Sequence, residues 1–179
     1  RSGEWFAVDH WRVVPDLITM AKGLTSAYVP LGAVGMRRGI ADHFKDKVFA
    51  GGLTYNTHPL GCGTALARLH VYEDDHLIDA ARKMGGVMKD LLATLQSRHA
   101  IVGAVRSIGL FGIVELVKDR QTMEPLAPFN GTSEPINKLR AIFREEGLYT
   151  FVRMNYFFTN PPLTITEEDL TSIDGIPLE

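Results

Sequence analysis

A short apolar run that ends at a lysine is the feature that most constrains the fold of this chain. Residues 17–21 (Leu-Ile-Thr-Met-Ala) suit a buried strand, with Pro15 and Asp16 at its start. Lys22 and Gly23 close the run. A lysine ammonium at the end of a buried parallel strand is costly to bury without a partner. Such a lysine therefore reaches solvent, forms an ion pair or is used covalently, and position alone favours the first alternative.

The surroundings of Lys22 favour covalent use. Residues 23–35 form a loop rich in glycine and small side chains, which lets the backbone approach a ligand closely. Together with residues 16–22, this loop resembles the lysine segment of the class III aminotransferases, which use pyridoxal 5′-phosphate (PLP). Two further segments, 1–7 (Arg-Ser-Gly-Glu-Trp-Phe-Ala) and 52–59 (Gly-Leu-Thr-Tyr-Asn-Thr-His-Pro), match the same family in the same order. The resemblance covers nearly the whole chain.

The resemblance implies an α/β fold, the PLP-dependent transferase fold type I. Residues 1–74 would be the C-terminal part of the large PLP-binding domain, and residues 75–179 a small C-terminal α/β domain that looks truncated. The last expected helix stops early at Gly175 and Pro177, whereas the family continues into a longer one. The aspartate that binds the pyridine nitrogen and the main phosphate loop are expected upstream of Arg1.

Hydrophobic spacing predicts two consecutive helices in the middle of the chain. The first begins at His58 or Pro59, with Thr57 as a cap, and ends near Glu73. The second runs over residues 77–99. Gly85-Gly86 should bend this helix or lower its stability, by up to ~1 kcal/mol per glycine relative to alanine. Its apolar residues recur every three or four positions, at Leu77, Ala81, Met84, Met88, Leu91 and Leu95.

Beyond His99 the pattern changes to strands and one further helix. This helix starts at Ser133 or Pro135, and Gly147 suits the position just after its end. The expected strands cover residues 101–106, 110–117, 148–152 and 156–159.

Three residues carry the chemistry that the resemblance implies. Lys22 would hold PLP through its amine and, once freed, move a proton, which requires the deprotonated form that desolvation favours. Thr54 would donate to the cofactor phosphate from the neighbouring subunit, which makes the working unit a homodimer with a shared active site; alternatively, it bonds only to local backbone. Arg153, which precedes Pro161-Pro162-Leu163, would pair with a substrate carboxylate; alternatively, it is a surface arginine in a hairpin.

Composition excludes several other classes of function. A formal net charge of −2 over 179 residues, with both signs interspersed, argues against a nucleic-acid partner. No apolar run reaches the ~20 residues of a membrane-spanning helix. The single cysteine excludes an intrachain disulfide framework and fits a reducing, cytoplasmic compartment. No metal site is expected.

The expected activity is transamination. Residues 147–163 look most like the branch of the family that moves an amino group from an ω-amino acid or amine, such as β-alanine or taurine, to pyruvate or a similar oxoacid. A PLP-dependent racemase or aminomutase of the same fold is an alternative. Another is a catalytically incomplete fragment that acts only as an assembly module. A Rossmann-type nucleotide binder is disfavoured, because no Gly-x-Gly-x-x-Gly turn follows a strand.

Overall fold

The computed structural model describes residues 1–172, and the chain divides into two compact units. Val8–Leu77 form one unit, called here the lysine unit. Arg1–Ala7 and Ile78–Glu179 form the other, called here the five-stranded unit. The border near Leu77 lies close to the expected one, but the first seven residues group with the later unit. The assignment of residues 1–74 and 75–179 to two domains of a larger enzyme stays a prediction.

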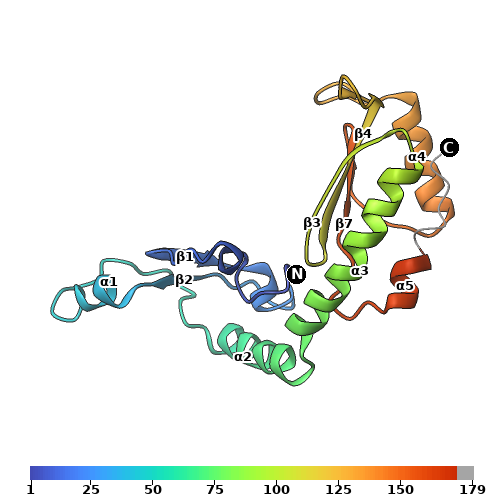
Figure 1. Cartoon of the computed structure of the whole chain (residues 1–179). Helices are drawn as coiled ribbons and strands as arrows, with labels where there is room; N and C mark the ends of the chain where they lie inside the picture. The colour runs from blue at the N-terminus through green and yellow to red at the C-terminus, as the bar shows by residue number, and fades with distance from the viewer. Residues whose placement is uncertain (173–179) are drawn as a thin grey trace. The chain divides into compact units, whose positions relative to one another are not determined.

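The lysine unit contains two short strands and one long helix (Figure 1). Its elements are η1 (Ala7–Trp11, whose first residue groups with the other unit), β1 (Leu17–Met20), η2 (Lys22–Leu24), β2 (Ala33–Met36), α1 (Arg38–Asp42) and α2 (Pro59–Asp74). The predicted strand before Lys22 and the predicted helix after His58 are therefore confirmed, the strand ending one residue early.

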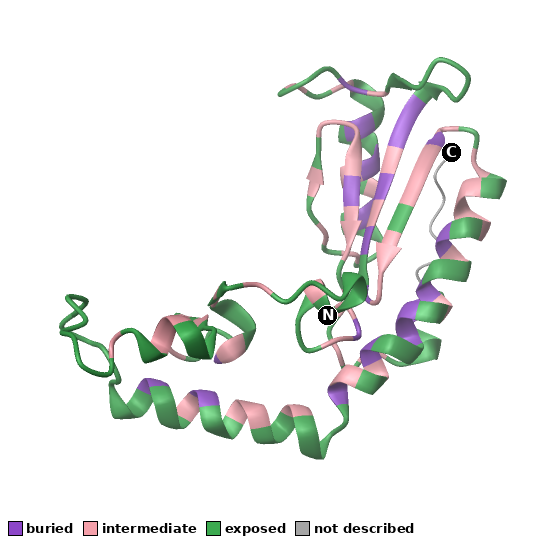
Figure 2. Cartoon of the chain, turned by 60° about the vertical axis from the view of Figure 1, so that its left-hand side comes forward, coloured by how far each residue is buried: buried purple, intermediate pink, exposed green. Residues whose placement is uncertain are grey.

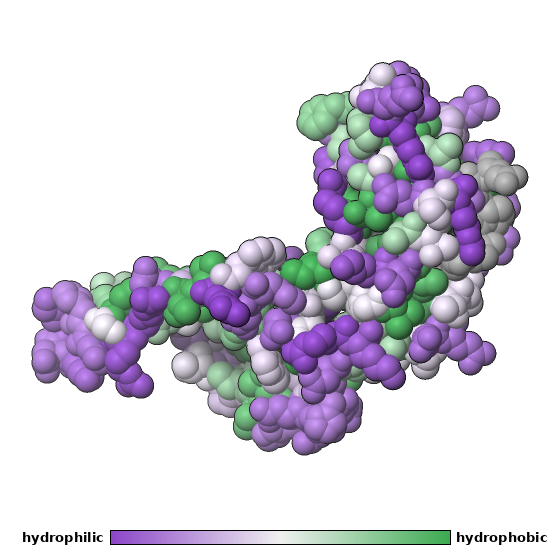
Figure 3. Space-filling view, in the orientation of Figure 1, coloured by the Kyte–Doolittle hydropathy of each residue, from purple (hydrophilic) through white to green (hydrophobic). Residues whose placement is uncertain are grey.

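The expectation of a buried parallel strand before Lys22 is wrong in this chain. β1 pairs with β2 in antiparallel register, with Leu17 opposite Met36 and Met20 opposite Ala33. The connection between them holds only the three-residue η2, whereas parallel neighbours usually need a helical crossover. Residues of β1 alternate between exposed and half-buried. Figure 3 shows hydrophobic side chains on the surface of this unit, and Leu17 and Val34 are 56% and 58% exposed.

His58, and not the predicted Thr57, caps α2. Nδ1 of His58 accepts a hydrogen bond from the backbone N–H of Leu60 at 3.3 Å. The Thr57 hydroxyl donates to the carbonyl oxygen of Asn56 at 2.7 Å, which directs it away from the helix. Pro59 occupies the first turn, where its missing N–H has no partner to lose.

The five-stranded unit is an antiparallel sheet with helices packed on it (Figure 1). The strand order is β3-β4-β7-β6, with β5 paired to β4. The predicted helices and the strands expected over 101–106, 110–117 and 156–159 are confirmed, with ends shifted by up to two residues, whereas the strand expected over 148–152 shares only Val152 with β6. Its elements are α3 (Leu77–Arg98, whose first residue groups with the lysine unit), β3 (Val102–Ile108), β4 (Phe111–Asp119), β5 (Glu124–Pro125), α4 (Glu134–Glu145), β6 (Val152–Arg153), β7 (Tyr156–Thr159) and α5 (Glu167–Ser172).

One hydrophobic core joins the sheet to α3, α4 and α5. Side chains from α3 meet those of β4 and β7, and Phe143 of α4 packs edge-on against Phe157, with ring centroids 5.0 Å apart. Figure 2 shows buried residues on the helix faces and strands of this unit. The predicted stripe of α3 is confirmed at four positions, Leu77, Ala81, Met84 and Met88, which are at most 7% exposed; Leu91 and Leu95 are partly buried.

The expected weak point at Gly85-Gly86 is not a break. α3 continues without interruption from Leu77 to Arg98. Gly85 is buried, and a Cβ built on it would lie 2.6 Å from the carbonyl carbon of Gly109, in the turn between β3 and β4. Gly86 is exposed and would meet nothing within 4 Å. Gly85 therefore permits close packing of a helix on a turn.

The ends of both long helices in this unit are bonded. Gly147 has φ +76° and its N–H donates to the carbonyl of Arg144 at 3.2 Å, which confirms its expected place after α4. Arg120 donates to carbonyls in and after the last turn of α3, including that of His99 at 2.6 Å.

The first residue of the chain is bonded to segments far along the sequence. The carbonyl of Arg1 accepts from the N–H of Leu110 at 2.9 Å, and its guanidinium donates to the carbonyl of Asn160 at 2.8 Å. Within residues 1–172, no helix has the length and apolar character needed to cross a membrane. The expected early stop at Gly175 and Pro177 lies outside the described residues.

Candidate functional site

Lys22 lies at the first position of η2, directly after β1 and Ala21. Its φ of +53° places the backbone in the left-handed region, which disfavours a lysine by roughly 1–2 kcal/mol. Lys22 is exposed in the described part of the chain, and the desolvation expected for its amine stays a prediction. The structure thus presents an accessible primary amine on a backbone that its surroundings must hold in an unfavourable conformation.

The loop after Lys22 holds itself together through Thr25. Thr25 is 2% exposed, and its hydroxyl donates to the carbonyl of Val29 at 2.7 Å. Its N–H donates to the carbonyl of Lys22 at 3.2 Å, and its carbonyl accepts from Tyr28 at 3.1 Å. Residues 26–27 also have positive φ. These bonds give the loop a defined shape despite its small side chains.

The same loop is bonded to α2 by a residue that the sequence did not point to. The hydroxyl of Tyr72 donates to the carbonyl of Gly23 at 3.2 Å. The guanidinium of Arg68, one turn earlier on α2, lies 4.0 Å from the centroid of the Tyr72 ring. The residue beside Lys22 is therefore attached to a long helix.

Thr54 belongs to the same compact unit as Lys22. It is exposed and begins the turn over residues 54–57, where the N–H of Asn56 donates to the carbonyl of Leu53 at 2.9 Å. Its role toward a phosphate stays a prediction.

Arg153 belongs to the five-stranded unit. It lies in β6, which pairs with β7 through Arg153 and Tyr156, and its side chain is exposed. One guanidinium nitrogen is 3.5 Å from Oδ1 of Asn130, which is long for a hydrogen bond. The structure brings it together with Asn130, and its role toward a carboxylate stays a prediction.

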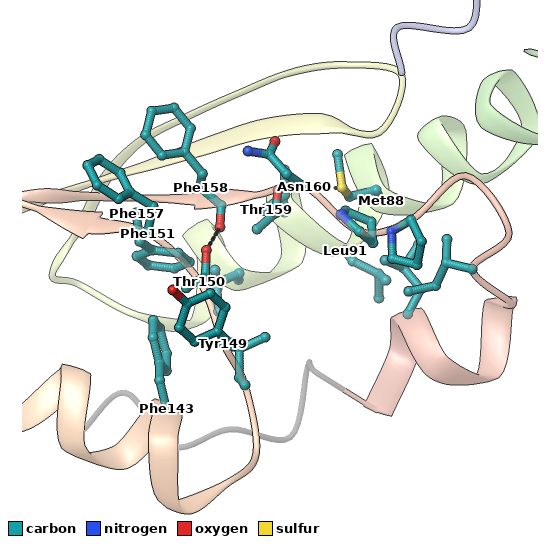
Figure 4. Close-up of a pocket in the computed structure, with 17 residues that line it drawn as sticks. Met88, Leu91, Phe143, Tyr149, Thr150, Phe151, Phe157, Phe158, Thr159 and Asn160 are labelled. Atoms are coloured by element: carbon teal, nitrogen blue, oxygen red, sulfur yellow. Dashed lines mark hydrogen bonds between the residues drawn. The ribbon is translucent and has the colours of Figure 1, made fainter. Parts of the chain in front are cut away.

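A cavity of about 430 Å³ lies in the five-stranded unit, and none of the three predicted site residues lines it (Figure 4). Its walls are mostly aromatic and aliphatic side chains from α3, α4, β7 and α5. Two hydroxyls on the wall bond to other lining residues: that of Thr150 donates to the carbonyl of Phe158, and that of Thr159 to the sulfur of Met88 at 3.4 Å. Such a lining offers no free charge for anchoring a phosphate or carboxylate. Among the described residues, no group of three or more His, Cys, Asp or Glu side chains is placed to hold a metal ion.

Comparison with known proteins agrees with the resemblance in the sequence. The family model "Aminotransferase class-III" matches residues 1–176. An uncharacterized aminotransferase, YhxA of Bacillus subtilis, is 36% identical over 97% of this chain and 40% of its own length. Taurine–pyruvate aminotransferase of Bilophila wadsworthia is 36% identical over 71% of this chain and 29% of its own length. The chain thus spans at most about 40% of these relatives.

Solved structures match over nearly the whole chain. Taurine:2-oxoglutarate aminotransferase from Bifidobacterium kashiwanohense, in complex with PLP and glutamate, is 35% identical with a TM-score of 0.88, over 98% of this chain and 40% of that one. An amine transaminase from an uncultivated Pseudomonas species, in its PLP-bound form, is 32% identical with a TM-score of 0.89, over the same shares. The predicted α/β fold of PLP-dependent transaminases is therefore confirmed. This chain belongs to the class III aminotransferases, a family whose cofactor is PLP.

Proposed function

We propose that this chain is part of a PLP-dependent transaminase that moves an amino group from an ω-amino acid or amine to pyruvate or a similar oxoacid. The observation that carries the proposal is Lys22 itself, an exposed amine at the end of β1 on a bonded loop of small residues. The taurine-specific names of two relatives support an ω-amino donor.

The residues of the lysine unit fit PLP chemically. When bound, PLP supplies an electron sink for the carbon that carries the substrate's amino group. Lys22 would hold the cofactor through Nζ, which reacts only in its deprotonated form. Freed by the incoming amine, Nζ would accept the proton from that carbon and deliver it to C4′ of the cofactor.

Thr54 would bind the cofactor phosphate of a neighbouring subunit. Its hydroxyl and N–H can both donate, and its exposure in the turn over residues 54–57 leaves it accessible to a group outside its own unit. This role requires a homodimer with a shared active site.

Arg153 would bind the substrate carboxylate. Guanidinium pairs with carboxylate through two parallel hydrogen bonds, and the 3.5 Å contact with Asn130 leaves its geometry adjustable.

A cytoplasmic location also remains a prediction.

The second candidate is an incomplete fragment that acts only as an assembly module. A lysine that holds a cofactor is desolvated, whereas Lys22 is exposed in the described part of the chain, which favours this alternative. In that case the chain would associate with other polypeptides but would not attach PLP by itself.

Reductive trapping separates the two proposals. The purified 179-residue chain is incubated with PLP, its visible spectrum is recorded, and borohydride reduction is followed by mass spectrometry of its peptides. A pyridoxyl adduct on Lys22, absent in Lys22→Ala and retained in Lys45→Ala, supports the transaminase. Lys45 is a suitable control because its side chain is 67% exposed. No adduct at saturating PLP, or labelling spread equally over all lysines, supports the module.

A further inference from the structure

We propose that Tyr72 is a positioning residue that holds the backbone of Lys22 through the carbonyl of Gly23. The inference rests on the proposed role of Lys22 and adds a residue from α2 to the site. Tyr72 lies 49 positions after Gly23 in the sequence, so the bond between them joins two separate segments of the lysine unit.

Three successive carbonyls around Lys22 are bonded. The carbonyl of Ala21 accepts from the N–H of Leu24 at 3.2 Å, and that of Lys22 accepts from Thr25 at 3.2 Å. These two bonds are local to the loop. The third, from the Tyr72 hydroxyl to Gly23 at 3.2 Å, connects the loop to a 16-residue helix.

This third bond matters because Lys22 has a positive φ. A lysine backbone at +53° returns to the right-handed or extended region unless its neighbours prevent it. The two peptide groups that flank Lys22 are bonded through the carbonyls of Ala21 and Lys22, and Tyr72 bonds the next group, so Lys22 cannot make this change without breaking a hydrogen bond. Tyr72 thereby attaches to α2 the segment that directly follows Lys22, and so limits how far the Lys22 backbone can move.

Arg68 orients the tyrosine. Its guanidinium lies 4.0 Å from the centroid of the Tyr72 ring, at the i, i+4 spacing that brings side chains together on a helix. Nε of Arg68 is buried and has no hydrogen-bond partner among the described residues, so stacking on the ring is the contact that accounts for its position. A ring confined in this way keeps its hydroxyl toward Gly23.

The close contact at Gly23 allows a second, independent test of the bond between Tyr72 and Gly23. A Cβ built on Gly23 would lie 3.2 Å from the Tyr72 hydroxyl oxygen, with no other neighbour within 4 Å. Gly23→Ala should therefore displace the hydroxyl of Tyr72, whereas the same substitution in a Tyr72→Phe chain meets open space.

The first measurement is hydrogen exchange of the full chain without PLP. Tyr72→Phe should raise the exchange rate of the segment 21–29 about two- to fivefold, the effect of losing one partly exposed hydrogen bond, and leave α2 unchanged. Tyr149→Phe is the matched control, because it removes a hydroxyl from a fully exposed tyrosine in the other unit. Gly23→Ala should act in the same direction in the wild-type background and not in the Tyr72→Phe background.

The second measurement is the PLP concentration that gives half-maximal trapped label on Lys22. Tyr72→Phe should raise this concentration about two- to fivefold without changing the labelling of other lysines. Three exchange results would each overturn the inference. The first is equal exchange rates in the wild-type and Tyr72→Phe chains, and the second is additive effects of Gly23→Ala and Tyr72→Phe. The third is faster exchange throughout the lysine unit. If the wild-type chain is labelled, an unchanged half-maximal PLP concentration for labelling of Lys22 in Tyr72→Phe would also overturn the inference. The two proposals can fail separately. If the wild-type chain takes no label but Tyr72→Phe still speeds hydrogen exchange of residues 21–29, the proposed function is rejected. The role of Tyr72 in holding the Lys22 backbone is then still supported.

Discussion

Adjacent glycines in α3 should respond in opposite directions to the same substitution. Gly86 is exposed with open space around it, so Gly86→Ala should stabilise the chain by about 0.8–1 kcal/mol, the difference in helix propensity. Gly85→Ala gains the same propensity, but its methyl would lie 2.6 Å from the carbonyl carbon of Gly109 and 2.9 Å from its oxygen.

The size of the clash follows from the atoms involved. Real Cβ atoms essentially never lie within 3.0 Å of such neighbours, and Gly109 offers backbone, which cannot rotate away as a side chain can. The turn after β3 must therefore move off α3, and overpacking of this kind costs about 1–3 kcal/mol. Because propensity cancels between the two variants, their difference in free energy of unfolding should equal this penalty.

Urea unfolding followed by far-ultraviolet circular dichroism measures the difference. With a denaturant slope of about 2 kcal/mol/M, Gly85→Ala should unfold at a urea concentration roughly 0.5–1.5 M below that of Gly86→Ala. Hydrogen exchange of α3 by mass spectrometry locates the effect, which should appear in α3 and in the turn at Gly109. Equal midpoints for the two variants would refute the reasoning, since they would show that α3 and the turn are not in close contact.

Two further substitutions test the packing of the five-stranded unit. Phe143→Ala should destabilise the chain by about 3–5 kcal/mol, because Phe143 is 3% exposed and its ring packs against Phe157; a loss below 1 kcal/mol in urea unfolding would contradict the described core. Arg120→Met keeps the apolar stem but removes donors to the carbonyls of Val102 at 2.9 Å and His99 at 2.6 Å, and should cost about 1–2 kcal/mol. Hydrogen exchange in Arg120→Met should rise mainly at the C-terminal end of α3. Exchange there as slow as in the wild-type chain would contradict the capping role of Arg120.

The helices could be predicted because their signals are local. The apolar stripe of α3 and Pro59 at the start of α2 depend on residues within one or two turns, and both helices were found within two residues of the expected ends. The cap of α2 was missed because Thr57 and His58 both carry suitable side chains. The choice between them depends on the Thr57 hydroxyl, which bonds to the preceding carbonyl.

The place of Lys22 at the end of a strand could be predicted, but its local geometry could not, and the roles of the three site residues stay predictions. Lys22 is visible because a lysine before a glycine-rich loop is a local pattern. Its positive φ and its contact with α2 through Tyr72 depend on a segment 49 residues away from Gly23, and no local signal reports such a pair. The antiparallel pairing of β1 was likewise missed, since pairing depends on β2 and on the connection between them.

The grouping of Arg1–Ala7 with the residues after Leu77 has a consequence for biosynthesis. A ribosome releases the lysine unit as one continuous stretch, so that unit can fold as soon as Leu77 has emerged. The other unit is split by it, and the hydrogen bonds of Arg1 cannot form until Leu110 and Asn160 have been translated. Contacts that span more than a hundred residues form slowly, so completion of the sheet around the first residues should be the late step in the maturation of this polypeptide.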